Sequence, residues 1–386
     1  MTQRLLSVDV FRGATIGLMI LVNNPGSWKY VYAPLRHANW HGWTPTDMVF
    51  PFFLFIVGVA ISLSFSKNFE QGASQTSLLK KIVRRTLIIF GLGLLLNGWP
   101  FGIPLSSVAA ENFSFSDIFD SILNIRILGV LQRIALCYLI ASLIYIYARS
   151  LRSRITITAV LLIIYELGMR LPLIDGWGAG SFELESNFAR YLDIKLIGAG
   201  NMYAVNKIPF DPEGLFSTLT ATITTLMGVF TGELLIGKID KYKKLIYISA
   251  LGLIVFVLGA LLDFVEPINK QLWTISYTLF MGGWAMIFLS ISIWFIDIKG
   301  WRKWLTPFIV LGSNPIVIYV GSSLMAKTLY LIKVSGNISL KSLIYTDILQ
   351  PIAGDFFGSF LYAFLFLTAW TAVGWVMYRK KIFVKI

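Results

Sequence analysis

The chain has 386 residues, of which 56% are hydrophobic and only 14% are charged, and it contains a single cysteine, Cys137. About a quarter of the residues of a soluble globular protein are charged, so this composition excludes a water-soluble particle, and the long apolar blocks exclude disordered, coiled-coil and disulfide-rich classes. The formal net charge of +13 is no sign of nucleic acid here, because basic residues of membrane proteins collect in cytoplasmic loops.

The predicted elements are membrane-spanning helices, each needing about 20 mainly apolar residues. The sequence contains ten such segments, at 5–22, 46–66, 82–97, 126–147, 155–173, 215–237, 245–263, 273–296, 305–324 and 356–378. The pattern is weakest in the first segment, which carries Asp9 and Arg12, and in the ninth, which contains Gly312 and Pro315. A signal peptide is the alternative for the first segment, but the charged pair and the absence of an A-x-A pattern disfavour it.

An even number of spans places both termini on one side of the membrane. The loops expected on that side are rich in Lys and Arg, so the positive-inside rule predicts that both termini are cytoplasmic. Three stretches on the opposite side are long, at 98–125, 174–214 and 325–354, and the third has the spacing of an interfacial or re-entrant segment. No repeat or soluble linker is evident, so residues 1–386 are expected to form one all-α polytopic domain.

Charged residues inside the spans are costly in lipid, so each should face a partner or a wet cavity. Glu166 and Arg170 are four residues apart and form the favourable order of a helical ion pair. Asp9 and Arg12 allow the same interpretation, but they lie near the cytoplasmic end, where an anionic ligand could share the arginine. Arg133 is expected to face either an acid of another helix or a ligand phosphate.

The two histidines of the chain, His37 and His41, both fall in the segment R-H-A-N-W-H-G-W-T-P-T-D between the first two spans. Asn23, Trp40 and Asp47 lie close to them in sequence. An interfacial belt of Trp and His at headgroup depth is one interpretation. The gathering of every histidine into one external segment favours chemistry instead.

Three kinds of chemistry are compatible with this segment. A metal site would use His37, His41 and Asp47, but Gly42 and Pro45 make a continuous helix doubtful and no further His or Cys completes the site, so no metal is expected. A Ser-His-Asp nucleophile stays open, although G-x-S-x-G is absent. A general base, His37 oriented by Asp47 with a side-chain amide as donor, fits the residue types best.

Seven sequence blocks carry a resemblance to a known family. They are S-V-D-V-F-R-G, L-V-N-N-P-G-S, H-A-N-W-H-G-W-T-P-T-D-M-V-F-P-F-F, R-I-L-G-V-L-Q-R-I, F-D-P-E-G-L-F-S-T-L, N-K-Q-L-W-T-I-S-Y and G-S-N-P-I-V-I-Y-V-G, in this order over nearly the full chain. Together they resemble the heparan-α-glucosaminide N-acetyltransferase family, the transmembrane acetyltransferases of lysosomes and their bacterial relatives.

The resemblance implies transfer of an acetyl group from cytosolic acetyl-CoA to the amine of an amino sugar or glycan on the external side. His37 matches the active-site histidine of the family, Asn23 its active-site asparagine, and Asp47 the acid that opens the next helix. The blocks that we expect around the coenzyme A tunnel contain Asp9, Arg12, Gln132, Arg133 and Asn314. Trp40 and His41 are expected to contact the acceptor.

Two departures from the family pattern affect the acceptor. The large luminal N-terminal region of the lysosomal enzyme has no counterpart, and His41 stands where that enzyme has asparagine, so we expect the acceptor to differ from heparan-derived glucosamine. The compact chain favours the bacterial inner membrane as its location. The sequence leaves the oligomeric state open between a monomer and a homodimer.

The expected topology places the donor and His37 on opposite sides of the membrane. Either the pantetheine arm threads between helices to His37, which we favour, or His37 carries an acetyl group between two half-reactions. A secondary transporter for an amino sugar or an anionic solute is the rival function, because intramembrane charges and interrupted helices are also typical of transporters. Clustered histidines and the lack of a repeat relating two halves disfavour it.

Overall fold

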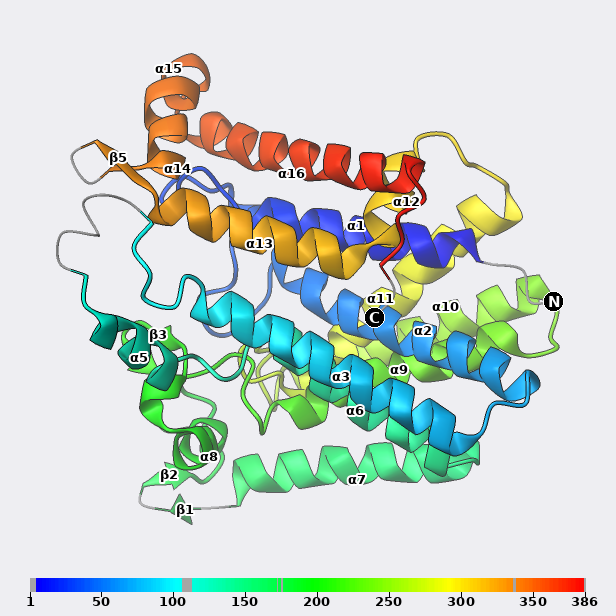
Figure 1. Ribbon diagram of the computed structural model, residues 1–386. Helices are drawn as coiled ribbons and strands as arrows, with labels where there is room; N and C mark the ends of the chain where they lie inside the picture. The colour runs from blue at the N-terminus through cyan, green and yellow to red at the C-terminus, as the bar shows by residue number, and fades with distance from the viewer. Residues whose placement is uncertain (1–4, 106–112, 172, 175, 336–337, 385–386) are drawn as a thin grey trace.

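The computed structural model describes residues 5–105, 113–171, 173–174, 176–335 and 338–384. Its long helices lie side by side, and the hairpins and the short helices other than α12 gather at one end of the bundle (Figure 1). The long helices are α1 (Leu6–Asn23), α2 (Val49–Glu70), α3 (Gln75–Gly98), α6 (Val130–Tyr147), α7 (Leu151–Arg170), α9 (Thr218–Ile236), α10 (Lys241–Leu262), α11 (Ile275–Ser292), α13 (Pro315–Leu331) and α16 (Asp355–Arg379). The described residues thus confirm a mostly helical fold.

The short elements connect these helices. The short helices are α5 (Phe115–Leu123), α8 (Phe188–Ile197), α12 (Thr306–Ser313), α14 (Leu340–Leu343) and α15 (Gln350–Ala353). The antiparallel hairpins pair β1 (Leu173–Ile174) with β2 (Trp177–Gly178), β3 (Ala204–Val205) with β4 (Ile208–Pro209), and β5 (Lys333–Ser335) with β6 (Ile338–Ser339). Most of them fall in the three long stretches predicted as external. Residues 106–112, 172, 175 and 336–337, which the predicted segments include, lie outside the described part of the chain.

Each of the ten predicted segments contains helix, but the count of ten spans is not confirmed. Within the described residues, seven helices are long and apolar enough to cross a membrane, or eight if α12 and α13 form one span. Helices α3 and α7 occupy the third and fifth predicted segments, yet charged side chains such as Lys81 and Arg84 in α3, and Arg154 and Glu166 in α7, lower their apolarity. Length and composition do not decide on which side the termini lie.

The ninth predicted span is two helices rather than one. Helices α12 and α13 meet at an angle of 86°. Asn314 lies between them with φ −132° and ψ 54°, and Pro315 begins α13. Proline lacks an N–H and disfavours helical backbone in the residue before it, so the sequence N-P breaks the helix at this point.

Glycines let the central helices approach closely. A Cβ at Gly58 of α2 would collide with the Thr225 carbonyl oxygen of α9, and one at Gly228 of α9 would collide with that of Phe55 in α2. Small residues at helix contacts are typical of membrane proteins, where backbone proximity replaces the hydrophobic driving force between helices.

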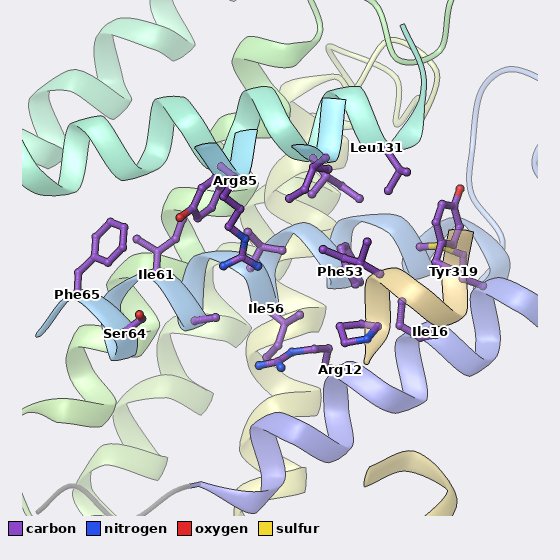
Figure 2. Close-up of a pocket in the computed structure, with 18 residues that line it drawn as sticks. Arg12, Ile16, Phe53, Ile56, Ile61, Ser64, Phe65, Arg85, Leu131 and Tyr319 are labelled. Atoms are coloured by element: carbon purple, nitrogen blue, oxygen red, sulfur yellow. The ribbon is translucent and has the colours of Figure 1, made fainter. Parts of the chain in front are cut away.

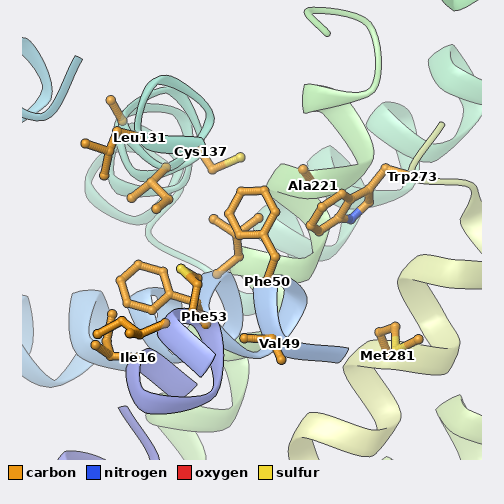
Figure 3. Packing of buried hydrophobic residues seen from close by; sticks show 14 of the residues in the cluster. Ile16, Val49, Phe50, Phe53, Leu131, Cys137, Ala221, Trp273 and Met281 are labelled. Atoms are coloured by element: carbon orange, nitrogen blue, oxygen red, sulfur yellow. The ribbon is translucent and has the colours of Figure 1, made fainter. Parts of the chain in front are cut away.

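The N-terminal hairpin of α1 and α2 forms the centre of the bundle. In the most apolar stretch of each helix, 67% of the residues are buried in α1, α2 and α9. The corresponding share is only 17% in α10 and 22% in α16. The largest apolar cluster joins Ile16 of α1 and Phe53 of α2 to Leu131 of α6 and to Trp273, just before α11 (Figure 3). The loop between α1 and α2, which carries both histidines, therefore joins two of the most buried helices of the fold.

Candidate active site

His37 and Asp47 are in direct contact in the loop that joins α1 to α2. Asp47 lies in the 3₁₀ turn Pro45–Met48 that leads into α2, and its Oδ1 is 2.6 Å from Nδ1 of His37. The Asp47 side chain is 1% exposed, whereas that of His37 is 39% exposed. The carboxylate is thus buried and the imidazole is accessible to a substrate.

The surroundings of Asp47 determine the tautomer of the imidazole. Its Oδ2 accepts hydrogen bonds from the backbone N–H groups of Ala38 and Thr44, at 3.0 Å each, and from Thr44 Oγ1 at 3.1 Å. A carboxylate bonded in this way is an acceptor only, so the proton between Asp47 and His37 belongs to Nδ1. In the neutral imidazole the lone pair then lies on Nε2, the atom that a base or nucleophile would use.

Asp47 also has a structural role. It forms a capping box with Thr44 at the start of the 3₁₀ turn, and its backbone carbonyl accepts a 2.7 Å hydrogen bond from the Tyr277 hydroxyl of α11. Capping and orientation of His37 are therefore properties of the same buried carboxylate, as the residue types allow.

A cavity of about 120 Å³ opens beside His37. Its lining residues are Met19, Val22, Asn23, His37, Thr46, Val49, Phe50, Val130, Glu213 and Lys270. Asn23 is the last residue of α1, and its neighbour Asn24 is the one that bonds back to the helix, through Nδ2 to the Ile20 carbonyl oxygen at 2.7 Å. The structure thus brings the predicted residues His37 and Asn23 to one cavity, with Asp47 behind the imidazole.

Lys270 belongs to this site, although reasoning from residue types did not select it. Its Nζ is 3.2 Å from Asp47 Oδ1 and 2.9 Å from His37 Nδ1. Lys270 lies in the loop between α10 and α11. This loop contacts the loop between α1 and α2, called the His loop below, where the Gly42 N–H donates a 2.7 Å hydrogen bond to the Ile268 carbonyl oxygen. The only sequence signal was the block N-K-Q-L-W-T-I-S-Y, and nothing in it indicates proximity to His37.

Glu213 is the second residue that was missed. It lines the His37 cavity and forms an ion pair with Arg126, which also makes a two-pronged contact with Asp211 through Nε at 2.9 Å and Nη2 at 2.7 Å. Burial alone would lower the pKa of Arg126, but Glu213 and Asp211 outweigh it and raise that pKa. The cavity wall therefore carries a carboxylate held in place by a permanent cation.

A second cavity, of about 190 Å³, lies between α1, α2, α3, α6 and α13. Arg12 and Arg85 line it, and they lie between Phe65 on one side and Tyr319 on the other (Figure 2). Arg85 is 4.8 Å from the ring of Tyr138, and its buried Nε has no hydrogen-bond partner within the described part of the chain. A buried donor in a basic, mostly apolar cavity suits an anionic ligand with an apolar arm.

The two cavities follow the same faces of three helices. On α1 the lining runs from Arg12 through Ile16 and Met19, which borders both cavities, to Asn23. Helices α2 and α6 also contribute residues to both cavities. On α6, for example, Val130 lines the His37 cavity and Leu131 lines the second cavity. From Arg12 to Asn23 the α1 face rises by about 16 Å, at about 1.5 Å per residue.

The other residues expected near coenzyme A have different surroundings. Asp9 forms an ion pair with Arg12 at 3.8 Å. Gln132 lies on α6 against Gly93 of α3. Asn314 bonds the chain after α16, donating to the Ile382 carbonyl oxygen at 2.9 Å and accepting from the Val384 N–H at 2.8 Å.

Arg133 was expected to face an acid or a phosphate, but its hydrogen-bond partners are others. Its guanidinium donates to the Gly214 carbonyl oxygen at 2.9 Å and to the Ser217 hydroxyl. It also lies 5.2 Å from the ring of Trp273. Gln132, Arg133 and Asn314 are absent from the described lining of both cavities.

Trp40 and His41 lie beside the His37 cavity rather than in its lining. Trp40 Nε1 donates to the Phe182 carbonyl oxygen at 2.9 Å. His41 Nε2 is 3.4 Å from Glu183 Oε1, and its Nδ1 is 3.3 Å from Asn269 Nδ2. Both therefore join the His loop to the long stretch between α7 and α9.

The chain is similar in sequence to known proteins along nearly its whole length. Residues 4–195 match the model of the family described as heparan-alpha-glucosaminide N-acetyltransferase, catalytic. The human protein named heparan-alpha-glucosaminide N-acetyltransferase is 28% identical over 433 residues, covering 99% of this chain and 60% of the human one. The mouse protein of the same name is 28% identical over 434 residues, covering 100% of this chain and 61% of the mouse one. The chain is therefore similar to the heparan-alpha-glucosaminide N-acetyltransferase family over residues 4–195, and to the human and mouse proteins of that name over nearly its whole length.

Proposed function

We propose that this membrane protein transfers an acetyl group from acetyl-CoA to the amine of an amino sugar or glycan on the external side. The observation that supports this most directly is the His37–Asp47 pair beside one cavity, with a second cavity that Arg12 and Arg85 line farther along the same helices. The name of the human and mouse relatives gives the same chemistry. The chain spans about 60% of their length, so the activity and the acceptor are proposals.

The proposed mechanism uses a neutral His37 with its lone pair on Nε2. As the acceptor nitrogen attacks the thioester carbonyl, Nε2 of His37 takes the amine proton, the C–N bond forms and the C–S bond breaks. The proton then passes to the departing thiolate, which leaves as coenzyme A. Asn23 donates to the oxyanion that develops on the carbonyl oxygen, and buried Asp47 stabilises the imidazolium.

The donor occupies the path between the two cavities. Arg12 and Arg85 hold the phosphates, since guanidinium groups bind phosphate through paired, charge-assisted hydrogen bonds. The pantetheine arm lies along the apolar face that leads to Asn23. The basic loops predict that the arginine end faces the cytosol, in a bacterial inner membrane. An acetyl-His37 intermediate requires the same path and the same free Nε2, and direct transfer needs one step fewer.

Coenzyme A release tests this function. The purified protein in proteoliposomes is given acetyl-CoA with glucosamine and a panel of amino sugars. His37→Ala is compared with Lys29→Ala, a change at an exposed lysine of the same loop. We expect acceptor-dependent release that is lost in His37→Ala and retained in Lys29→Ala. Labelled sugar crossing the vesicle membrane without any release of coenzyme A would replace acyl transfer by transport.

A further inference from the structure

Lys270 occupies a position that affects the charge of His37. Its side chain is 20% exposed and its Nζ touches both members of the His37–Asp47 pair, at 2.9 Å and 3.2 Å. We propose that Lys270 is a positioning residue that keeps His37 uncharged at neutral pH, so that Nε2 is free to act in the acyl transfer proposed above.

The argument depends on where the protons lie. Since His37 donates its Nδ1 proton to Asp47, Nδ1 has no lone pair left for Lys270, and the ammonium donates to Asp47 Oδ1. Two cationic or donor groups then approach within 2.9 Å, and a second proton on the imidazole would place two positive charges side by side. A like charge at this distance disfavours the protonated form.

Without Lys270 the buried carboxylate would favour the imidazolium. Asp47 alone beside His37 is an ion pair in a poorly solvated site, and it would hold the histidine in the protonated form, which is no base. With Lys270 present, the Asp47 charge is already balanced. The result is a neutral imidazole with a fixed tautomer, and a carboxylate that still stabilises the imidazolium transiently.

The other charged groups near the site do not balance the Asp47 charge. Glu213 lines the cavity, but Arg126 is paired with it and with Asp211. Arg36 precedes His37 and donates through Nε to the Val31 carbonyl oxygen at 2.7 Å. Lys270 is therefore the cation in contact with the pair among the described residues.

The scarcity of histidine allows a direct test. In His41→Asn, His37 is the only histidine of the chain, so the rate of imidazole modification by diethyl pyrocarbonate, followed by absorbance, reports its unprotonated fraction at each pH. We expect the midpoint of this pH curve to move upward by about 1 unit or more when Lys270→Met is added. Lys29→Met is the matched control and should leave the midpoint in place, and Lys270→Arg should preserve it.

An unchanged midpoint in Lys270→Met would overturn the proposal. If that variant does not fold, as judged by size exclusion, Lys270→Gln provides a second neutral side chain for the same measurement. The assay needs no turnover, so it remains decisive even if acyl transfer is not observed. Conversely, an unchanged midpoint would leave acyl transfer by His37 standing.

Discussion

At the scale of single residues, the site depends on a buried carboxylate. Asp47 uses both oxygens: Oδ2 accepts from the Ala38 and Thr44 N–H groups, and Oδ1 contacts His37. The imidazole is therefore oriented by the same group that begins α2. Catalytic geometry and local folding are coupled at this position, and substitutions must be chosen to separate them.

The variant Asp47→Asn should abolish most of the activity without unfolding the protein. An amide at this position would donate to Nδ1 of His37 and place the proton on Nε2, so the base would be lost. We expect kcat for coenzyme A release to fall by about 100-fold or more. Activity within a few-fold of the native protein would show that the pair does not orient the base.

Asn23 and Asn24 offer a matched comparison. Asn23 lines the His37 cavity, whereas Asn24 bonds the Ile20 carbonyl oxygen. Asn23→Ala should lower kcat by about 100-fold, the usual cost of losing one oxyanion donor, with little change in KM for acetyl-CoA. Asn24→Ala should retain kcat. Equal losses in the two variants would indicate a capping effect on α1 instead.

At the scale of elements, close helix contacts position the helices that line both cavities. Helices α1, α2 and α6 line both cavities, and α2 is fixed against α9 through glycines on both helices. A shift of α2 would move Asp47 and the cavity lining together. Packing far from His37 should thus influence catalysis.

Gly228→Ala and Gly91→Ala separate packing from helix propensity. A methyl group at Gly228 would meet the Phe55 carbonyl oxygen, whereas nothing lies within 4 Å of a methyl group at Gly91. Overpacking costs about 1–3 kcal/mol, so Gly228→Ala should lower the thermal midpoint measured by fluorescence-detected size exclusion. Gly91→Ala should keep or raise it. The opposite order would contradict the packing seen between α2 and α9.

Asp193 of α8 should make the stability of the fold depend on pH. Burial raises its pKa from 3.8 to about 7, against the lowering effect of the Leu215 and Phe216 N–H groups that it accepts. A raised acid pKa favours the folded state most at low pH, and that contribution is lost as the pH rises through 7. The thermal midpoint should therefore fall between pH 5 and pH 8, and fall less in Asp193→Asn. Parallel curves for the two proteins would exclude this role.

At the scale of the whole molecule, the two cavities predict that donor and acceptor enter from opposite sides of the membrane. Arg12 and Arg85 mark one end and His37 the other. In oriented proteoliposomes, acetyl-CoA should support the reaction only from the arginine side and the acceptor only from the His37 side. Equal activity with both substrates on one side would contradict the path.

Filling the arginine-lined cavity should block donor binding without affecting the His37 cavity. Ala60 lines the arginine-lined cavity but not the His37 cavity. Ala60→Trp should therefore abolish acetyl-CoA binding, measured by isothermal titration. The rate at which diethyl pyrocarbonate modifies His37 should stay unchanged. Ala60→Ser, which adds little volume, should bind normally. Retained binding in Ala60→Trp would move the donor site elsewhere.

The sequence by itself determined the class of the molecule and the chemical core of its site. Apolar blocks must become buried or membrane-spanning helices, because the backbone has no other way to satisfy its hydrogen bonds in lipid. His37 and Asp47 are close in sequence, so a tight turn before α2 was enough to bring them together. The resemblance added Asn23 and the family.

Only the tertiary structure decided which distant residues complete the site. Lys270 lies 233 positions from His37 along the chain, and residue type gives no sign of that proximity. Likewise, the Arg133 guanidinium donates to Gly214 and Ser217 rather than to an acid, and Arg85, near the start of the third predicted span, lines the second cavity. The reason is physical: periodicity fixes which face of a helix is buried, but the identity of the neighbour depends on how the helices pack.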